Sequence, residues 1–346
     1  MVKRRSFLKY AGTGISSITI GSVISNVSGC NTKSTNYSLD HQIKTPFHIQ
    51  KLPDYVKPDT EILKVGLCQI YTEPWTIEDN FSRTLTAIDT AAQKGAEIAI
   101  TPECVIHGYS WDDSQGKSDS FRDKLYGIAE TLDSEHLTQI KIKAQQHKMY
   151  IMIGFVEKGE TNKIHNTAAL ISPKGEFIYV YRKVHCRHFE SIHHWGYFTP
   201  GDKFYSETLN FDDRNFNIGT MICFDREIPE SLRCLRALGA EIVLCPLATN
   251  TSDLTSYRNR ADNEMITRIR ATSNELFIVV VNHAGRFNGG SFIAGPQGEV
   301  FCQLSEEPDV IVYDVPLGAI REKFHNEPLG WMGWGYRRDD VYKKYL

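Results

Sequence analysis

The sequence lacks an excess of positive charge, a long apolar run and paired cysteines. Its 39 Lys and Arg residues are balanced by 42 Asp and Glu residues, which gives a formal net charge of -3. Proteins that bind nucleic acid usually present a basic face, so we expect no nucleic acid as a partner. No apolar run long enough to span a bilayer follows the N-terminal segment, and we expect no membrane-spanning helix there.

None of the eight cysteines is spaced as a CxxC pair. Cys30 belongs to the N-terminal segment described next, and the other seven form an odd set. This pattern excludes a disulfide scaffold and a zinc ribbon. It leaves seven candidate thiols, which are Cys68, Cys104, Cys186, Cys223, Cys234, Cys245 and Cys302.

The N-terminal segment resembles an export signal. Residues 3–9 read Lys-Arg-Arg-Ser-Phe-Leu-Lys, which resembles the twin-arginine consensus, and a weakly apolar stretch follows. That stretch is too short and too polar for a stable membrane span. Residues 27–30 read Val-Ser-Gly-Cys and resemble a lipobox, a pattern in which the cysteine is lipidated.

We therefore expect residues 1–30 to be a twin-arginine signal with a lipobox, and residues 31–60 to be a flexible tether. Cys30 is the expected lipidation site. The protein would be exported by the twin-arginine route and anchored as a lipoprotein, in the periplasm or on the cell surface. It would meet the membrane only through this lipid. The alternative is a cytosolic protein whose basic start is fortuitous.

Residues 61–346 alternate apolar strands with amphipathic helices, which predicts parallel strands covered by helices. Two segments with Pro and Gly between strands predict antiparallel hairpins in the same sheets. We interpret this region as one domain with a C-terminal tail rich in Trp, Tyr and Arg. The tail would form a contact surface or wrap its own core. Helices are expected at 80–94, 134–147, 229–238 and 258–274, and strands at 62–70, 97–101, 150–156, 167–172, 176–183, 216–223, 241–246, 277–282, 291–294, 299–302 and 310–315.

Cys223 has the local context of a nucleophile. An apolar strand, 218–222, leads to it, and a sharp turn and a helix with Pro229 in its first turn follow. A nucleophile between strand and helix is exposed at the sheet edge, near backbone N–H groups that can stabilise an oxyanion. The alternative is a small buried apolar residue, as most free cysteines are.

Two other segments carry charges at strand ends. Glu103 follows Pro102 just beyond a strand, where open α/β sheets hold their sites, and Lys183 ends the first hairpin. Together with Cys223 they resemble the motifs of the nitrilase, or carbon–nitrogen hydrolase, superfamily, in the order of that family. The matching stretches are Thr-Pro-Glu at 101–103, Tyr-Arg-Lys-Val-His at 181–185, Phe-Thr-Pro-Gly-Asp at 198–202 and Met-Ile-Cys-Phe-Asp-Arg-Glu-Ile-Pro-Glu at 221–230.

The resemblance spans Leu63 to Glu322. It implies an αββα sandwich, with two mixed sheets face to face and helices on the outer faces. It also implies a catalytic triad of Glu103, Lys183 and Cys223 that hydrolyses a non-peptide C–N bond in a small amide or N-carbamoyl substrate. The alternative reaction is nitrile hydrolysis by the same triad. We expect no cofactor, and a homodimer or higher homo-oligomer.

The chemistry of these residue types agrees with that assignment. A neutral thiol is a poor nucleophile and needs a base or a neighbouring cation. Glu103 can take the thiol proton and later protonate the departing ammonia or amine. Lys183 can remain charged beside the thiolate and the oxyanion, and the backbone N–H of Phe224 is a second oxyanion donor. A thioester intermediate would then be hydrolysed by water.

The segment 185–197 offers a candidate for a second carboxylate and several histidines. The family usually has a second glutamate soon after the lysine motif, and Glu190 is the only acid here, at an offset that departs from the usual spacing. His194 lies nearer the usual place when counted back from the next motif, and we carry it as a candidate substrate-binding residue. The His-rich loop 185–194 also admits a metal-dependent hydrolase, although the expected site holds no metal. A catalytically inactive binding protein is the third class.

Arg226 lies three residues after the nucleophile. In relatives that cleave N-carbamoyl amino acids, an arginine at this offset is associated with binding the substrate carboxylate, and a planar guanidinium suits that task. The alternative is an ion pair with Glu227 or Glu230 that braces the turn. The Phe-Asp-Arg-Glu stretch after Cys223 resembles amide hydrolases more than true nitrilases.

Overall fold

The computed structural model describes residues 47–49, 51–110, 118–194, 196–249, 261–325 and 334–345. The N-terminal signal, with Arg4, Arg5 and Cys30, lies outside these residues. Residues 42–346 form one compact unit. Its strands are β1 (Phe47–His48), β2 (Leu63–Gln69), β3 (Ile98–Ile100), β4 (Tyr150–Lys158), β5 (Ile164–Ile171), β6 (Phe177–Arg182), β7 (Ser206–Phe211), β8 (Arg214–Thr220), β9 (Ile242–Pro246), β10 (Phe277–Val281), β11 (Phe292–Ala294), β12 (Val300–Gln303) and β13 (Asp309–Val315).

The helices are α1 (Ile77–Gln93), α2 (Asp119–Ile128), α3 (Glu135–His147), α4 (Pro229–Ala237), α5 (Ala261–Asn274) and α6 (Asp339–Tyr342). Among the described residues, no helix is both long and apolar enough to cross a membrane.

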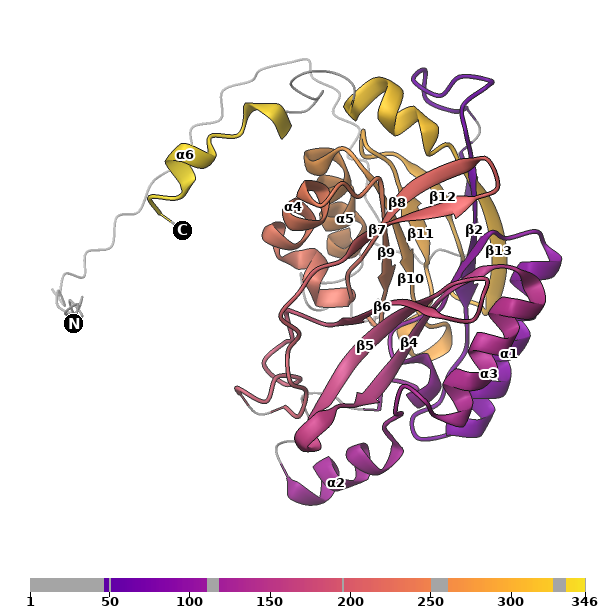
Figure 1. The fold of residues 1–346 in the computed structure, drawn as a ribbon, viewed down its shortest axis with the longest axis vertical. Helices are drawn as coiled ribbons and strands as arrows, with labels where there is room; N and C mark the ends of the chain where they lie inside the picture. The colour runs from indigo at the N-terminus through magenta and orange to yellow at the C-terminus, as the bar shows by residue number, and fades with distance from the viewer. Residues whose placement is uncertain are drawn as a thin grey trace, which may run out of the picture. The chain divides into compact units, whose positions relative to one another are not determined.

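Two mixed sheets form the centre of this unit (Figure 1). One sheet has the order β1-β12-β11-β10-β9-β8-β7, and the other has the order β13-β2-β3-β4-β5-β6. In the first sheet β8, β9 and β10 run parallel, and in the second β2, β3 and β4 do. Antiparallel hairpins join β5 to β6 and β11 to β12, as their Pro-x-Gly turns predict.

Apolar side chains alternate between two layers because successive residues of a strand face opposite sides of a sheet. In β4, Met152 belongs to the apolar cluster between the two sheets, which also holds Leu244 of the opposite sheet. Its neighbour Ile151 packs outward with Ile140 of α3. Helices α1 and α3 cover this outer face, and α4 and α5 lie against the other sheet (Figure 1). The expected αββα sandwich is thereby confirmed.

Several boundaries differ from the sequence-based expectation. Strand β8 ends at Thr220, and Cys223 begins a short 3-10 helix that runs to Glu227. Helix α2 and strand β7 were not expected, because α2 buries only Leu125 and β7 buries only Leu209 and Phe211. In β7 these two residues form only one alternating pair, whereas in α2 Phe121, Leu125 and Ile128 have the helical spacing i, i+4, i+7, and sequence reasoning missed this signal.

The expected tether extends less far than residue 60. Strand β1 pairs antiparallel with β12, and Tyr55 is buried against Phe324 with ring centroids 5.2 Å apart. A buried aromatic ring contributes apolar area that holds this segment on the domain. In the C-terminal tail, Arg236 of α4 lies 5.1 Å from the Trp334 ring, so this part of the tail contacts its own domain.

Candidate active site

The three expected catalytic residues follow strands at one end of the sandwich. Glu103 lies beyond β3, and its backbone N–H donates to Leu247 O at 3.4 Å, which joins it to the loop after β9. Lys183 follows β6, and its N–H donates to Asn166 O at 2.8 Å. A Cβ on Gly154 of β4 would lie 2.4 Å from Pro102 O, so the Glu103 loop needs glycine beside it.

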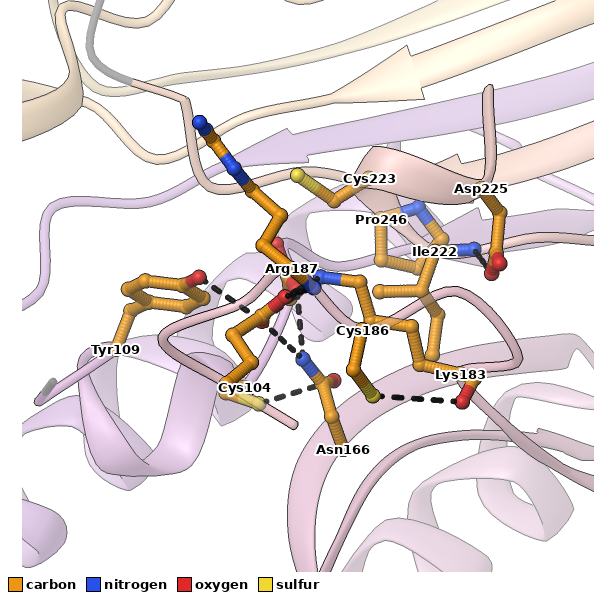
Figure 2. A network of polar contacts seen from close by, with 12 residues as sticks. Cys104, Tyr109, Asn166, Lys183, Cys186, Arg187, Ile222, Cys223, Asp225 and Pro246 are labelled. Carbon is orange, nitrogen blue, oxygen red and sulfur yellow. Dashed lines mark hydrogen bonds and ion pairs between the residues drawn. The ribbon is translucent and has the colours of Figure 1, made fainter. Parts of the chain in front are cut away.

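A buried cation joins two carboxylates at this end of the sandwich (Figure 2). Lys183 Nζ donates to Glu103 Oε1 at 2.9 Å and to Glu190 Oε1 and Oε2 at 2.8 and 2.9 Å. All three side chains are 0% exposed. Burial opposes the charge of Lys183, but the charges of Glu103 and Glu190 outweigh it and hold the Lys183 pKa well above its usual range. Lys183 is therefore a permanent cation at neutral pH.

One oxygen of the Glu103 carboxylate is hydrogen-bonded, and the other is not. Its Oε1 accepts from Lys183 Nζ and, at 2.7 Å, from Asn166 Nδ2. Its Oε2 is buried and has no hydrogen-bond partner. Burial raises the pKa of Glu103, and Lys183 offsets this only in part. A carboxylate with one unpaired buried oxygen and a raised pKa is suited to accept a proton.

Cys223 occupies a strained turn. Its φ is +46°, in the left-handed region that non-glycine residues rarely adopt, and its Sγ lies 3.7 Å from Thr249 Oγ1. Burial, followed by the negative charge of Glu103, raises the pKa of the thiol, and Lys183 lowers it by less. Lys183 therefore does not produce a resting thiolate by itself, and a base must take the thiol proton during attack.

Asp225 braces the turn that carries Cys223. It accepts from the Tyr181 hydroxyl at 2.6 Å, from the Ile222 N–H at 3.0 Å and from the backbone N–H of His185 at 2.8 Å. These bonds tie the turn to the segment that holds Lys183. Phe224 lies in the first turn of the 3-10 helix, where backbone N–H groups lack an intrahelical acceptor.

A model of the carbon–nitrogen hydrolase family matches residues 64–323. The chain belongs to the carbon–nitrogen hydrolase family. It is 30% identical over 273 residues to a nitrilase of Pyrococcus abyssi, covering 77% of this chain and 94% of the relative. It is 28% identical over 286 residues to an N-carbamoylputrescine amidase of Solanum tuberosum, covering 78% and 90% of the two chains.

Solved structures share the fold of this hydrolase. An amidase from Nesterenkonia sp. AN1 superposes with a TM-score of 0.66 at 21% identity, covering 84% of this chain and 98% of that one. The hydrolase is therefore an enzyme that acts on C–N bonds other than peptide bonds.

The structure brings some of the remaining candidate residues to the site and not others. Glu190 joins the cluster through Lys183, and Tyr109 donates to its Oε1 at 3.0 Å. His194 does not join it, because its N–H closes a turn on Ser191 O and its side chain is exposed. Within the described ranges, no group of three His, Cys, Asp or Glu side chains is placed to hold a metal ion.

Arg226 of this hydrolase is 1% exposed. Its Nη2 donates to Asn263 Oδ1, whereas its Nε and Nη1 are buried without a hydrogen-bond partner. In the described part of the chain it forms no ion pair with Glu227 or Glu230, so the bracing role considered from the sequence is not observed. A buried guanidinium with two unpaired nitrogens is costly unless a further acceptor binds there.

Sequence reasoning missed the residues that position Glu103. Asn166 of β5 donates to Glu103 Oε1 and accepts from the Cys104 thiol at 3.3 Å. His283 accepts from the Thr72 hydroxyl at 2.8 Å and donates to Glu103 O at 2.7 Å. Burial lowers the pKa of His283 to about 4, so the ring is neutral. No spacing signal marked these residues. Asn166 stands between His165 and Thr167 in β5, and His283 follows Asn282 just after β10.

Proposed function

We propose that this hydrolase cleaves the C–N bond of a small amide or N-carbamoyl compound through a thioester on Cys223. The observation that carries the proposal is that the two oxygens of the Glu103 carboxylate have different surroundings. One oxygen is held by Lys183, and the other is unpaired in a buried site whose charges also act on the Cys223 thiol. This arrangement supports a base that is fixed in place and has one oxygen available.

In the first half-reaction Cys223 Sγ forms a bond to the carbonyl carbon while Glu103 Oε2 takes the thiol proton. The charge that develops on the substrate oxygen would be stabilised by Lys183 Nζ and the Phe224 N–H. The C–N bond then breaks, and Glu103 returns the proton to the nitrogen, which leaves as ammonia or an amine. The enzyme is left as a thioester, or as a carbamoyl thioester from a carbamoyl substrate.

In the second half-reaction water adds to the thioester carbon. Glu103 takes a proton from that water, and the C–S bond breaks as Cys223 recovers its proton. The product is a carboxylic acid, or carbamic acid from a carbamoyl substrate. Glu190 keeps Lys183 fixed throughout, because both of its oxygens accept from the same Nζ.

The names of several relatives support an amide or carbamoyl substrate. They include an (R)-stereoselective amidase of Pseudomonas sp and a citrullinase of Francisella tularensis, which are 28% and 25% identical to this chain. Arg226 is proposed to bind an acidic group of the substrate through its unpaired Nε and Nη1. Nitrile hydrolysis remains the second candidate, because the Pyrococcus abyssi relative is named a nitrilase.

The export and assembly of the enzyme are also proposals. The motifs at residues 3–9 and 27–30 support a lipoprotein delivered by the twin-arginine route. The aromatic and Arg-rich C-terminal tail supports a homodimer or higher homo-oligomer.

Ammonia release from small amides, N-carbamoyl amino acids and nitriles tests the reaction. We expect the wild-type enzyme to hydrolyse amides or carbamoyl compounds, and Cys223→Ala to release no ammonia while unfolding within a few degrees of wild type. Turnover by correctly folded Cys223→Ala would overturn the thioester mechanism. Release from nitriles alone would replace amide hydrolysis with nitrile hydrolysis.

A further inference from the structure

The backbone of Arg187 is hydrogen-bonded to the catalytic cluster. Its N–H donates to Glu190 Oε2 at 2.9 Å, and its carbonyl accepts from the N–H groups of Glu190 and Ser191, both at 2.9 Å. The same carboxylate that fixes Lys183 therefore fixes the start of the Arg187 side chain. In Figure 2 this side chain extends away from the labelled Asn166 and Lys183, into the upper part of the view where the labelled Cys223 also lies.

Two aromatic rings hold the Arg187 guanidinium. Its Cζ lies 5.1 Å from the Phe189 ring centroid and 5.5 Å from that of Phe224, the residue after the nucleophile. Both contacts are within the range of cation–π attraction. Both rings and the Arg187 side chain itself are half-buried. The rings therefore restrict the guanidinium, while part of the Arg187 side chain stays accessible. Ring faces do not satisfy N–H donors, which lie in the plane of the guanidinium.

No hydrogen bond or ion pair of the guanidinium is observed within the described ranges. The contrast with other arginines of this domain is clear. Arg182 is paired with Glu157, Arg214 with Glu97 and Arg321 with Glu241. Those arginines serve the fold, whereas the Arg187 guanidinium has no such partner among the residues that the structure describes, and its planar set of donors is available to an external acceptor. Such a set matches the two oxygens of a carboxylate.

The net charge of the site determines which substrates benefit from the Arg187 donors. Glu103 and Glu190 carry two negative charges against the one positive charge of Lys183, so an anionic substrate needs a further cation to offset repulsion. Arg187 supplies that cation beside Phe224, and Arg226 supplies a second one that is buried. A cationic substrate would instead meet an unpaired guanidinium.

We propose that Arg187 selects substrates in which the scissile amide or carbamoyl group is borne by a molecule with a carboxylate. The inference rests on the proposed function and narrows it, because it favours acidic amides over neutral or cationic ones. Arg187 contacts the carboxylate and not the reacting atoms, so it determines specificity and takes no part in proton transfer.

A set of substrates matched in length tests this proposal. Succinamate, butyramide and 3-aminopropanamide carry an anionic, neutral and cationic end on the same chain. N-carbamoyl-β-alanine, propylurea and 2-aminoethylurea form the corresponding carbamoyl set. For the wild type we expect kcat/KM to be about 10- to 100-fold higher for the anionic member than for the neutral one, as for a hydrogen-bonded ion pair.

Three substitutions at Arg187 refine the test. Arg187→Gln should lower the anionic-to-neutral ratio about 10-fold, and the preference that remains would be due to Arg226. Arg187→Lys should retain more of the preference, and Arg187→Glu should shift it toward the cationic member. The ratio is measured within one protein sample, so a loss of folded enzyme cancels. Arg83→Gln is the matched control, because Arg83 is exposed and also lies over a ring, that of Tyr71 at 5.4 Å.

An unchanged ratio in Arg187→Gln would overturn the role of Arg187 and leave carboxylate binding to Arg226. A wild-type preference for the neutral or cationic member would overturn the proposed substrate class while leaving the thioester mechanism intact. If the wild type hydrolyses no member of either set and Cys223 resists alkylation by iodoacetamide, the proposed function fails and this inference fails with it.

Discussion

Replacement of Lys183 by Met removes one charge and keeps most of the volume of the side chain. In the wild type, Lys183 Nζ contacts three carboxylate oxygens at 2.8 to 2.9 Å. The substitution leaves Glu103 and Glu190, both 0% exposed, without the cation that separates them. It therefore perturbs the electrostatics of the site with little loss of packing.

Two effects of different size follow. Removal of one partner of a buried ion pair costs about 3–5 kcal/mol of unfolding free energy. Loss of an oxyanion donor lowers turnover by about 10²–10³, and loss of the positive charge beside the thiol adds to that defect. Part of the stability cost is recovered when one carboxylate binds a proton.

The sign of the pH dependence follows from the direction of the Glu103 pKa. Burial already raises this pKa, and loss of Lys183 raises it further. When the pKa of a glutamate is higher in the folded than in the unfolded protein, the folded protein loses stability as the pH rises. The loss begins near the pKa of the unfolded state and is complete above the pKa of the folded state. Thermal unfolding of Lys183→Met should therefore show a larger deficit against wild type at pH 8 than at pH 5.5.

Alkylation of Cys223 reports on the cation directly. Lys183 lowers the pKa of this thiol, so in Lys183→Met the peptide-resolved rate with iodoacetamide should fall at a given pH, and its profile should move to higher pH. The control is Arg182→Met, one residue earlier, which removes a cation whose side chain is 40% exposed. An unshifted profile with turnover near wild type would show that Lys183 is a bystander.

Four further perturbations test the proton transfer, the positioning of Glu103, the export and the lipid anchor. Glu103→Gln should lower turnover by about 10²–10⁴-fold and abolish the fall of kcat/KM at acidic pH. In the wild type this fall should occur above the ordinary pKa of glutamate, because burial raises the pKa of Glu103. If the fall persists in Glu103→Gln, it belongs to another titrating group. Asn166→Asp replaces the donor to Glu103 Oε1 with an acceptor, so it should raise the Glu103 pKa and move that fall to higher pH, whereas an unmoved fall would deny Asn166 a positioning role. Replacing Arg4 and Arg5 by Lys should retain the precursor in the cytoplasm, and Cys30→Ser should release the protein from membranes; normal delivery or unchanged fractionation would refute the respective assignment.

Much of the fold was predictable because its central strands are buried on both faces. Strand β9 reads Ile-Val-Leu-Cys-Pro and β10 reads Phe-Ile-Val-Val-Val, and every residue of both strands is buried. Such short apolar runs between turn signals predict central strands. Strand β7 was missed because its sequence Ser-Glu-Thr-Leu-Asn-Phe lies at a sheet edge and is largely exposed. Edge strands need few apolar residues.

Only the site residues that stand in a recognisable local sequence context could be predicted. Glu103, Lys183 and Cys223 each follow a strand, and this context was visible in the sequence. Asn166 and His283 act through contacts with Glu103 that span 63 and 180 residues of sequence. Only the three-dimensional arrangement reveals such partners.

Trapping the covalent intermediate tests the central claim most directly. Wild-type enzyme would be mixed with a hydrolysed amide, quenched in acid within the turnover time, digested and analysed by tandem mass spectrometry. We predict a mass increase equal to the acyl group on the Cys223 peptide, lost on treatment with hydroxylamine, and no adduct in Cys223→Ala. An acyl group on Cys104 or Cys186, or continued ammonia release by folded Cys223→Ala, would contradict the thioester mechanism.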